Sequence, residues 1–224
     1  EKGLILIVSP PQSGRTTTLY ASIKEVDVFL HTIVMIEERE EYELDHVDRR
    51  FTFDVSKGES FDAIWARGER EDPDVVAIGE IKNTQVAVKA CEIARSKLVF
   101  TTMQAPDAAS ALAQMLALGV PGPLLAETLG AVLAQRLVRL LCTDCRMQYE
   151  PPPGLLAKLK IPPEKAGTWF EAAGCPNCAQ IGFRGRTGLY PLQCGNRLAA
   201  VAVPAPAQKR VTRDDGGDGH HPCG

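Results

Sequence analysis

"GLILIVSPPQSGRTT", residues 3–17, is the most informative segment of this 224-residue chain for its fold. The run "GLILIV" is typical of a buried strand, and a helical pattern begins after the loop. The loop is similar to the phosphate-binding pattern G-x-x-x-x-G-K-[ST], of which it keeps Gly14 and Thr16. Ser9 stands where the pattern has its first glycine, and Arg15 stands where it has lysine. The segment therefore predicts a strand, an altered phosphate-binding loop and a helix.

Further apolar runs alternate with helical patterns along the chain. We predict strands over residues 3–8, 32–36, 74–81 and 97–103. We predict helices that begin near Thr16, follow the third strand, and cover residues 107–118 and 123–140. Strands that alternate with helices predict an α/β fold with a mainly parallel sheet.

Composition favours a folded protein over a disordered or membrane-spanning one, since 45% of the residues are hydrophobic and the net charge is −3. This charge gives no electrostatic reason to expect nucleic acid as a partner. The apolar stretches are too short or too interrupted by charge to span a bilayer, and no signal peptide pattern opens the sequence. We therefore expect a cytoplasmic protein. Because the sequence starts abruptly at the first strand, we also expect it to be a fragment.

Four of the seven cysteines form two C-x-x-C pairs, Cys142 with Cys145 and Cys175 with Cys178. Disulfides are rare in the cytosol, and two such pairs present four thiolates in the way that a structural zinc site requires. The alternative is four reduced thiols without a metal. The pattern favours zinc, because two such pairs rarely arise by chance.

The chain is predicted to have three parts. Residues 1–141 would form the nucleotide-binding core. Residues 142–192 contain the paired cysteines and few predicted strands, so we expect a small zinc-stapled appendage whose folding depends on the metal. Residues 193–224 have no periodicity and many breakers of helix and strand, which is typical of a disordered tail.

Polar residues that could act on a nucleotide follow the predicted strands. Ligands of such α/β domains bind at the carboxyl ends of the strands, where the loop, the acidic residues after 32–36 and Glu80 would meet. The start of the helix would hold phosphates with backbone N–H groups. Arg15 would neutralise them, Thr16 would bind Mg²⁺ and Glu80 would position water. Each residue alone is weak support, because acidic clusters usually lie on a solvated face.

The order and spacing of these motifs resemble the ATPases that power type II secretion and type IV pilus assembly. The tetracysteine region is typical of the secretion and pilus-extension branch of this family. The similar stretches all lie within residues 1–192 and are "IEEREEY" (36–42), "EDPDVVAIGEIKN" (71–83), "GAVLAQRLVRLLCTDC" (130–145), "GCPNC" (174–178) and "GFRGRTGLYPL" (182–192).

The resemblance implies a P-loop (RecA-like) core that binds ATP and Mg²⁺, a structural Zn²⁺, and a homo- or hetero-hexamer. It also implies a peripheral position at the inner membrane, through a platform protein of a secretion or pilus machine. Members of the family also carry an N-terminal domain, which we expect to be absent from this sequence. Glu80 is implied as the catalytic residue and Cys142, Cys145, Cys175 and Cys178 as metal ligands. The implied nucleotide-binding residues are Ser13, Gly14, Arg15, Thr16 and Thr17, and the acidic box associated with Mg²⁺ contains Glu37, Glu38 and Glu41.

The sequence departs from the family where chemistry is expected. Arg15 replaces the loop lysine, Gln12 replaces a loop glycine, and the two histidines of the family's histidine box are Lys97 and Gln104. Arginine and lysine are not interchangeable between phosphates, so we expect nucleotide binding with weak or lost hydrolysis. Two alternatives remain, namely an active ATP-hydrolysing motor and a truncated, non-functional remnant. Whether the chain is an enzyme is left open.

Overall fold

The computed structural model describes residues 2–40, 47, 49–54, 57–162, 167–190 and 192–194. Glu41 of the predicted acidic box lies outside these ranges, as do residues 195–224 of the predicted tail.

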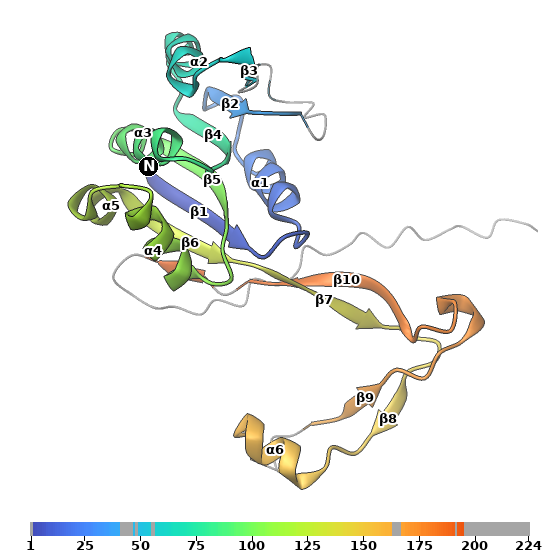
Figure 1. The fold of residues 1–224 in the computed structure, drawn as a ribbon. Helices are drawn as coiled ribbons and strands as arrows, with labels where there is room; N and C mark the ends of the chain where they lie inside the picture. Colours follow the sequence, from blue (N-terminus) through green and yellow to red (C-terminus); the bar gives the residue numbers. More distant parts are fainter. Residues whose placement is uncertain are drawn as a thin grey trace, which may run out of the picture.

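A seven-stranded sheet with helices packed around it forms the main body of the molecule (Figure 1), in the order β11-β6-β1-β5-β4-β2-β3. All neighbouring strands are parallel except β11, which pairs antiparallel with β6. This arrangement confirms the predicted α/β class with a mainly parallel sheet. The strands are β1 (Gly3–Ser9), β2 (Ile33–Glu37), β3 (Arg49–Thr52), β4 (Val75–Glu80), β5 (Leu98–Gln104), β6 (Leu129–Ala134) and β11 (Leu192–Cys194).

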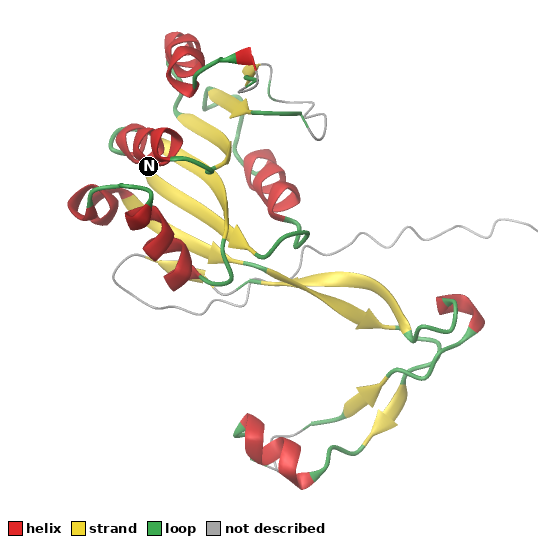
Figure 2. Ribbon diagram, in the orientation of Figure 1, coloured by secondary structure: helices red, strands yellow, loops and turns green. Residues whose placement is uncertain are grey.

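Helices cover both faces of this sheet (Figure 2). On one face, α1 (Arg15–Lys24) packs Leu19 and Ile23 against the strands. The other face carries the larger apolar cluster, to which four helices contribute. These are α2 (Phe61–Gly68), α3 (Thr84–Ala94), α4 (Ala108–Ala117) and α5 (Gly122–Thr128). Because helices cover both faces of the central strands, most residues of these strands are apolar. This explains why the strands could be predicted from continuous apolar runs in the sequence.

Capping residues fix where three of these helices begin. The side chain of Ser60 accepts a hydrogen bond from the N–H of Ala63 at the start of α2. Asn83 caps α3 and Asp107 caps α4 in the same way. Each cap satisfies a backbone N–H that has no partner within its helix. The cap of α3, Asn83, lies three residues after Glu80 and so fixes the path of the chain leaving β4.

The helix predicted over 123–140 is wrong beyond Thr128. Residues Leu129–Ala134 form β6, and Arg136–Leu141 form a further strand, β7. The apolar spacing of this segment fits either structure, as is usual for short apolar runs. The segment forms a strand because β6 pairs with β1 in a parallel ladder that runs from Leu4 to Val8 of β1. The sequence interpretation also missed β3 and α2.

The cysteine arm, which we define as the described residues between 136 and 190, extends away from the sheet (Figure 1). Its root is an antiparallel ribbon of β7 and β10 (Phe183–Leu189). A second ribbon joins β8 (Met147–Tyr149) to β9 (Trp169–Glu171), and α6 (Pro153–Leu159) lies beyond it. Two short 3₁₀ turns complete the described elements, η2 (Glu69–Glu71) in the core and η4 (Pro176–Cys178) in the arm.

The chain returns from the cysteine arm to the sheet through β11. Gln193 and Cys194, which the sequence interpretation assigned to the tail, are the last two residues of this strand. No described helix combines the length and the apolar character that crossing a bilayer requires.

Candidate functional site

The loop between β1 and α1 is built as a phosphate-binding loop would be. Gly14 immediately precedes the helix with φ of 80°, a left-handed conformation that favours glycine. No side chain among the described residues caps α1 at Gly14. The N–H groups of the first turn therefore remain available for an anion, and the helix dipole favours negative charge there.

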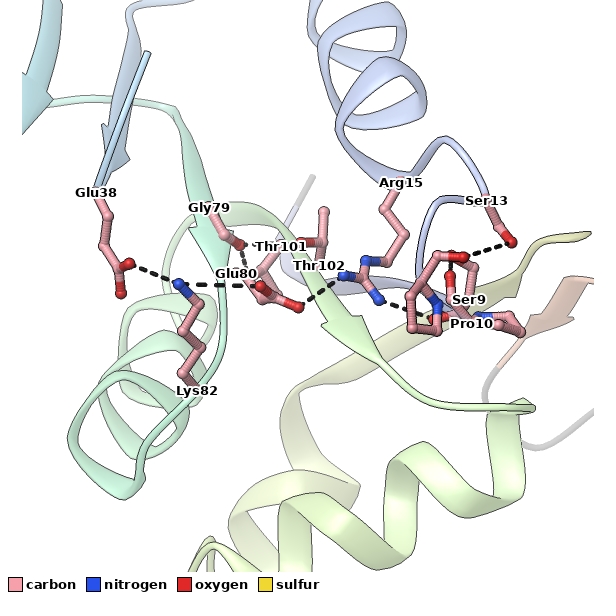
Figure 3. A network of polar contacts seen from close by, with 11 residues as sticks. Ser9, Pro10, Ser13, Arg15, Glu38, Gly79, Glu80, Lys82, Thr101 and Thr102 are labelled. Atoms are coloured by element: carbon pink, nitrogen blue, oxygen red, sulfur yellow. Dashed lines mark hydrogen bonds and ion pairs between the residues drawn. The ribbon is translucent and has the colours of Figure 1, made fainter. Parts of the chain in front are cut away.

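Arg15 and Glu80, the two residues central to the predicted chemistry, are paired with each other. The Nη2 of Arg15 donates to Oε1 of Glu80 at 2.7 Å, and its Nη1 donates to the carbonyl of Ser9 at 2.8 Å (Figure 3). The side chains of Arg15 and Glu80 are only 16% and 30% exposed. The loop cation is thus held by a carboxylate and by the loop's own backbone.

A second cation lies on the other side of Glu80. Lys82 Nζ is 2.6 Å from Oε2 of Glu38 and 4.0 Å from Oε2 of Glu80. Figure 3 shows the resulting row of alternating charge, which runs from Glu38 through Lys82 and Glu80 to Arg15. Since the charges neutralise one another in pairs, an anionic ligand must compete with carboxylates that are already in place.

An irregularity in β4 sets the direction of Glu80. The ladder between β4 and β5 shifts register between Ile78 and Glu80. The Oγ1 of Thr101 donates to the carbonyl of Gly79 at 3.0 Å, which holds the irregular turn. Bulges of this kind commonly turn a side chain toward an active site. Here the bulge places Glu80 against Arg15 rather than along the regular alternation of the strand.

Glu37 has a different environment from the rest of the acidic box. It is 5% exposed, accepts a hydrogen bond from the hydroxyl of Tyr20 at 2.8 Å, and pairs with Arg50. Desolvation acts to lower the pKa of Arg50, but the hydrogen bond to Glu37 and the charges of Glu37, Tyr20 and Glu40 together outweigh it and raise that pKa. The sequence interpretation missed Tyr20 and Arg50, because a lone tyrosine on a helix and an arginine on an edge strand carry no motif.

A cavity of about 320 Å³ joins the predicted residues. Five of the predicted residues line it, namely Arg15, Thr16, Glu37, Glu38 and Glu80. Ser13 and Gly14 are in the adjacent loop, and Thr17 is exposed on α1. Gln104, at a histidine-box position, lines a neighbouring cavity that also reaches Glu80 and Lys82. The structure therefore brings the loop, the acidic residues and Glu80 to one edge of the sheet.

Gln12 has φ of 57°, in the left-handed region where a side chain is strained. Because glycine adopts this conformation without strain, Gln12→Gly is expected to raise the free energy of unfolding by about 0.5–1 kcal/mol. Urea unfolding followed by circular dichroism measures the change. Gln12→Ala is the matched control, since it keeps the Cβ and should give no comparable gain. A loss of stability in Gln12→Gly would contradict the strain argument.

The four predicted cysteines form one cluster in the cysteine arm. Cys142 follows β7 directly, Cys175 immediately precedes η4 and Cys178 is its last residue, so the ribbon of β7 and β10 brings the two pairs together. Their four Sγ atoms all lie within 4.8 Å of one another. Three separations are 3.9 Å (Cys142–Cys175), 3.8 Å (Cys145–Cys178) and 3.7 Å (Cys175–Cys178). Four sulfurs at about 2.3 Å from a tetrahedral zinc would lie about 3.8 Å apart, so the cluster could hold zinc.

Backbone N–H groups point at these sulfurs. The N–H of Cys175 and that of Gly182 each donate to Cys178 Sγ at 3.2 Å, and the N–H of Gly174 donates to Cys145 Sγ at 3.3 Å. Desolvation acts to raise the pKa of the Cys178 thiol, but the N–H groups of Cys175 and Gly182, together with hydrogen bonds to the thiols of Cys175 and Cys145, lower it to about 7. Desolvation raises the pKa of the Cys145 thiol to about 12. Cys178 is therefore the thiol that most readily gives the thiolate form that a metal requires.

The fold and the site together define a P-loop-type α/β nucleotide-binding domain with a four-cysteine appendage. The chain belongs to the family described as Type II/IV secretion system protein, whose sequence model matches residues 1–214. This finding confirms the resemblance to secretion and pilus assembly ATPases.

Named relatives agree with this assignment. The Type II secretion system protein E of Pseudomonas aeruginosa is 35% identical over 195 residues, a match that covers 85% of this chain and 38% of that protein. The Type IV pilus assembly ATPase PilB of the same organism is 30% identical over 218 residues, covering 96% of this chain and 37% of that protein. The chain therefore spans less than two fifths of either relative.

Solved structures share the fold. The Legionella pneumophila ATPase DotB superposes with a TM-score of 0.58 at 15% identity, covering 88% of this chain and 46% of that chain. The pilus retraction motor PilT with bound ADP gives a TM-score of 0.56 at 21% identity, covering 88% of this chain and 48% of that chain. At these identities the likeness supports the architecture alone.

Proposed function

We propose that this chain binds a nucleotide with Mg²⁺ and hydrolyses it weakly or not at all, as a subunit of a protein secretion or pilus assembly machine. The observation that carries the proposal is the contact between Arg15 and Glu80 inside the cavity. The backbone of the loop and the start of α1 offer the phosphate site. The residues expected to assist chemistry are instead bound to each other.

Arginine at the loop position affects hydrolysis more than binding. The guanidinium keeps its positive charge, but it is planar and longer than the lysine ammonium, so it cannot occupy the same position between phosphates. Losing one well-placed contact to a transition state lowers the rate by about 10²–10³. In addition, Arg15 must leave Glu80 and Ser9 before it can reach a ligand.

The remaining predicted residues have roles that fit their positions. Thr16 lines the cavity and could ligate Mg²⁺ with its hydroxyl, and Glu38 could assist through water once Lys82 moves. Glu37 is committed to Tyr20 and Arg50, so we assign it to holding β2 and β3 rather than to binding the ion directly. Ser13, Gly14 and Thr17 would contribute backbone N–H groups.

We assign zinc to the four-cysteine cluster. Its support is the spacing between sulfurs and the N–H groups that point at them. Cys142, Cys145, Cys175 and Cys178 would be the ligands, and the ion would have a structural role because all four positions of a tetrahedral site are filled by protein.

The family assignment supports a place for this chain in a larger assembly. Members are expected to form hexamers and to act at the cytoplasmic side of the inner membrane with a platform protein. We propose the same for this chain, as a homo-hexamer or with an active relative. The matched relatives are named for both type II secretion and pilus assembly, so both systems are candidates.

An active motor is the second candidate, favoured by Thr16 and Glu80 lining the same cavity beside Gly14. In that case Arg15 would release Glu80 on nucleotide binding, and Glu80 would then position water. The two candidates differ in turnover and not in nucleotide affinity.

The test is Mg-ATP binding and turnover of the purified chain and of Arg15→Lys. We expect turnover of the unaltered chain to fall well below about 1 s⁻¹, with measurable nucleotide affinity. Arg15→Lys should bind ATP several-fold more tightly, because an ammonium reaches the phosphates and pairs less firmly with Glu80. Fluorescent nucleotide titration and phosphate release measure the two quantities.

Arg95→Lys is the matched control, because Arg95 is exposed directly after the end of α3 and, among the described residues, forms an ion pair only with Glu127. It should leave both quantities unchanged. Turnover of the unaltered chain above about 1 s⁻¹ would favour the active motor. Absence of nucleotide affinity in both the unaltered chain and Arg15→Lys would refute the proposed binding.

A further inference from the structure

Gln135 is a buried polar residue to which the sequence motifs assign no role. It lies between β6 and β7, at the point where the sheet continues into the cysteine arm. Only 2% of it is exposed. Its backbone N–H donates to the carbonyl of Val8 at 2.7 Å, which extends the ladder between β6 and β1. The main chain at Gln135 is therefore fixed by the sheet.

The side-chain amide of Gln135 joins two parts of the phosphate-binding unit. Its Oε1 accepts a hydrogen bond from the hydroxyl of Thr18 in the first turn of α1, at 2.5 Å. Its Nε2 donates to the backbone carbonyl of Ser13 in the loop, also at 2.5 Å. One side chain thus holds both the loop and the helix that follows it.

Gly14 lies against this amide. A Cβ at Gly14 would be 3.0 Å from Nε2 of Gln135, closer than side chains ordinarily pack. The N–H of Thr18 also donates to the carbonyl of Gly14 at 3.0 Å, so the same short segment is held from within the helix. The left-handed turn at Gly14 and the amide of Gln135 therefore fit together as one unit.

We infer that Gln135 is the positioning residue of the phosphate-binding loop. It fixes the Ser13–Gly14 turn and the start of α1, and so directs the N–H groups of that turn before any ligand is present. It acts through the loop and not by contact with the ligand. Its effect on nucleotide affinity rests on the proposed function, whereas its effect on the loop does not.

The physical reason is the cost of leaving buried polar groups without partners. Without the amide, the carbonyl of Ser13 and the hydroxyl of Thr18, both in part-buried hydrogen bonds, lose their partners. The loop then relaxes toward solvent, and binding an anion must first restore its shape. The apparent affinity for the anion is the intrinsic affinity multiplied by the fraction of molecules whose loop is in the binding-competent conformation, so it falls as that fraction falls.

Gln135→Leu removes both hydrogen bonds while keeping a similar volume. In the ligand-free chain we expect hydrogen exchange of the amides in residues 12–16 to become about tenfold faster. Affinity for Mg-ADP should fall about 10- to 100-fold, the range expected for one or two buried hydrogen bonds. Thr18→Val removes one bond only and should give a smaller change of the same sign. Gln85→Leu is the matched control, because its amide makes an exposed bond to Asp62 away from the loop.

Gln135→Glu separates positioning from general damage to the fold. At pH 7.5 the introduced carboxylate cannot donate to the carbonyl of Ser13. At about pH 5.5 its neutral form can donate again, since burial raises the pKa of a carboxyl group. Loop protection and Mg-ADP affinity, each taken as a ratio to the unaltered chain at the same pH, should therefore recover as the pH falls. A fold weakened in general would not recover.

The outcomes are distinct. Faster loop exchange in Gln135→Leu and Thr18→Val, with recovery of Gln135→Glu at low pH, supports the positioning role. Unchanged loop exchange in Gln135→Leu, or equal changes in Gln85→Leu, overturns it. Absence of ADP affinity in the unaltered chain refutes the proposed function, while the exchange data still decide the role of Gln135.

Discussion

Replacing Cys178 with serine is expected to abolish stoichiometric metal binding and to unfold the cysteine arm, while the sheet domain stays folded. Cys178 is 5% exposed, and its Sγ receives two backbone hydrogen bonds, from the N–H groups of Cys175 and Gly182. Structural zinc contributes about 10–16 kcal/mol to small domains, far more than two-stranded ribbons such as β7–β10 and β8–β9 supply. The core has its own apolar clusters and does not depend on the ion.

Metal analysis of the purified protein measures the first effect, and limited proteolysis with hydrogen exchange over the cysteine arm measures the second. The unaltered chain should contain about one zinc per chain, and Cys178→Ser should contain well under one tenth of that. Cys91→Ala is the control, because Cys91 is buried in α3 far from the cluster. A full equivalent of zinc in Cys178→Ser, or none in the unaltered protein, would contradict the assignment.

Replacing Glu80 with glutamine is expected to change binding and turnover in opposite directions. Removing the carboxylate frees Arg15 from its partner at 2.7 Å, so affinity for Mg-ATP should rise about three- to tenfold, which corresponds to roughly 1 kcal/mol for a partly exposed ion pair. Any remaining hydrolysis should fall by about 10²–10⁴, because an amide cannot accept a proton from water. Nucleotide titration and single-turnover phosphate release measure the two effects.

The matched control for Glu80 is Glu92→Gln, which removes an exposed carboxylate paired with Lys89 along α3. It should leave affinity and turnover unchanged. If affinity falls in Glu80→Gln, Glu80 supports the ligand instead of competing for Arg15, and the interpretation of the ion pair is wrong. If turnover is unaffected, Glu80 is not the catalytic residue.

The sequence predicted the elements whose environment is nearly uniform along the chain. Strands β1, β2, β4 and β5 are covered by helices on both faces, so each reads as an unbroken apolar run. Metal ligands in two C-x-x-C pairs can also be found from spacing, because each pair forms within a single turn. These features depend on near neighbours in the chain.

In the segment 123–140, local sequence patterns do not distinguish a helix from a strand. Its apolar residues suit a helix and a strand equally, and the choice between them was made by the open edge of β1, which lies far away in the sequence. The family resemblance identified the candidate site residues of the loop and of β4. It gave no indication of how their side chains would pair.

The sequence by itself determined the α/β class, the altered loop at Arg15 and the four cysteines, because these follow from local periodicity and spacing. Only the tertiary structure decided that Arg15 is bound to Glu80, 65 residues away, and that Gln135 holds Ser13 across 122 residues. Such contacts depend on which strands are neighbours in the sheet and on the path that the chain takes where each strand ends. The loop's sequence suggests a weakened phosphate site, and the folded chain shows which residues its cation and its backbone contact.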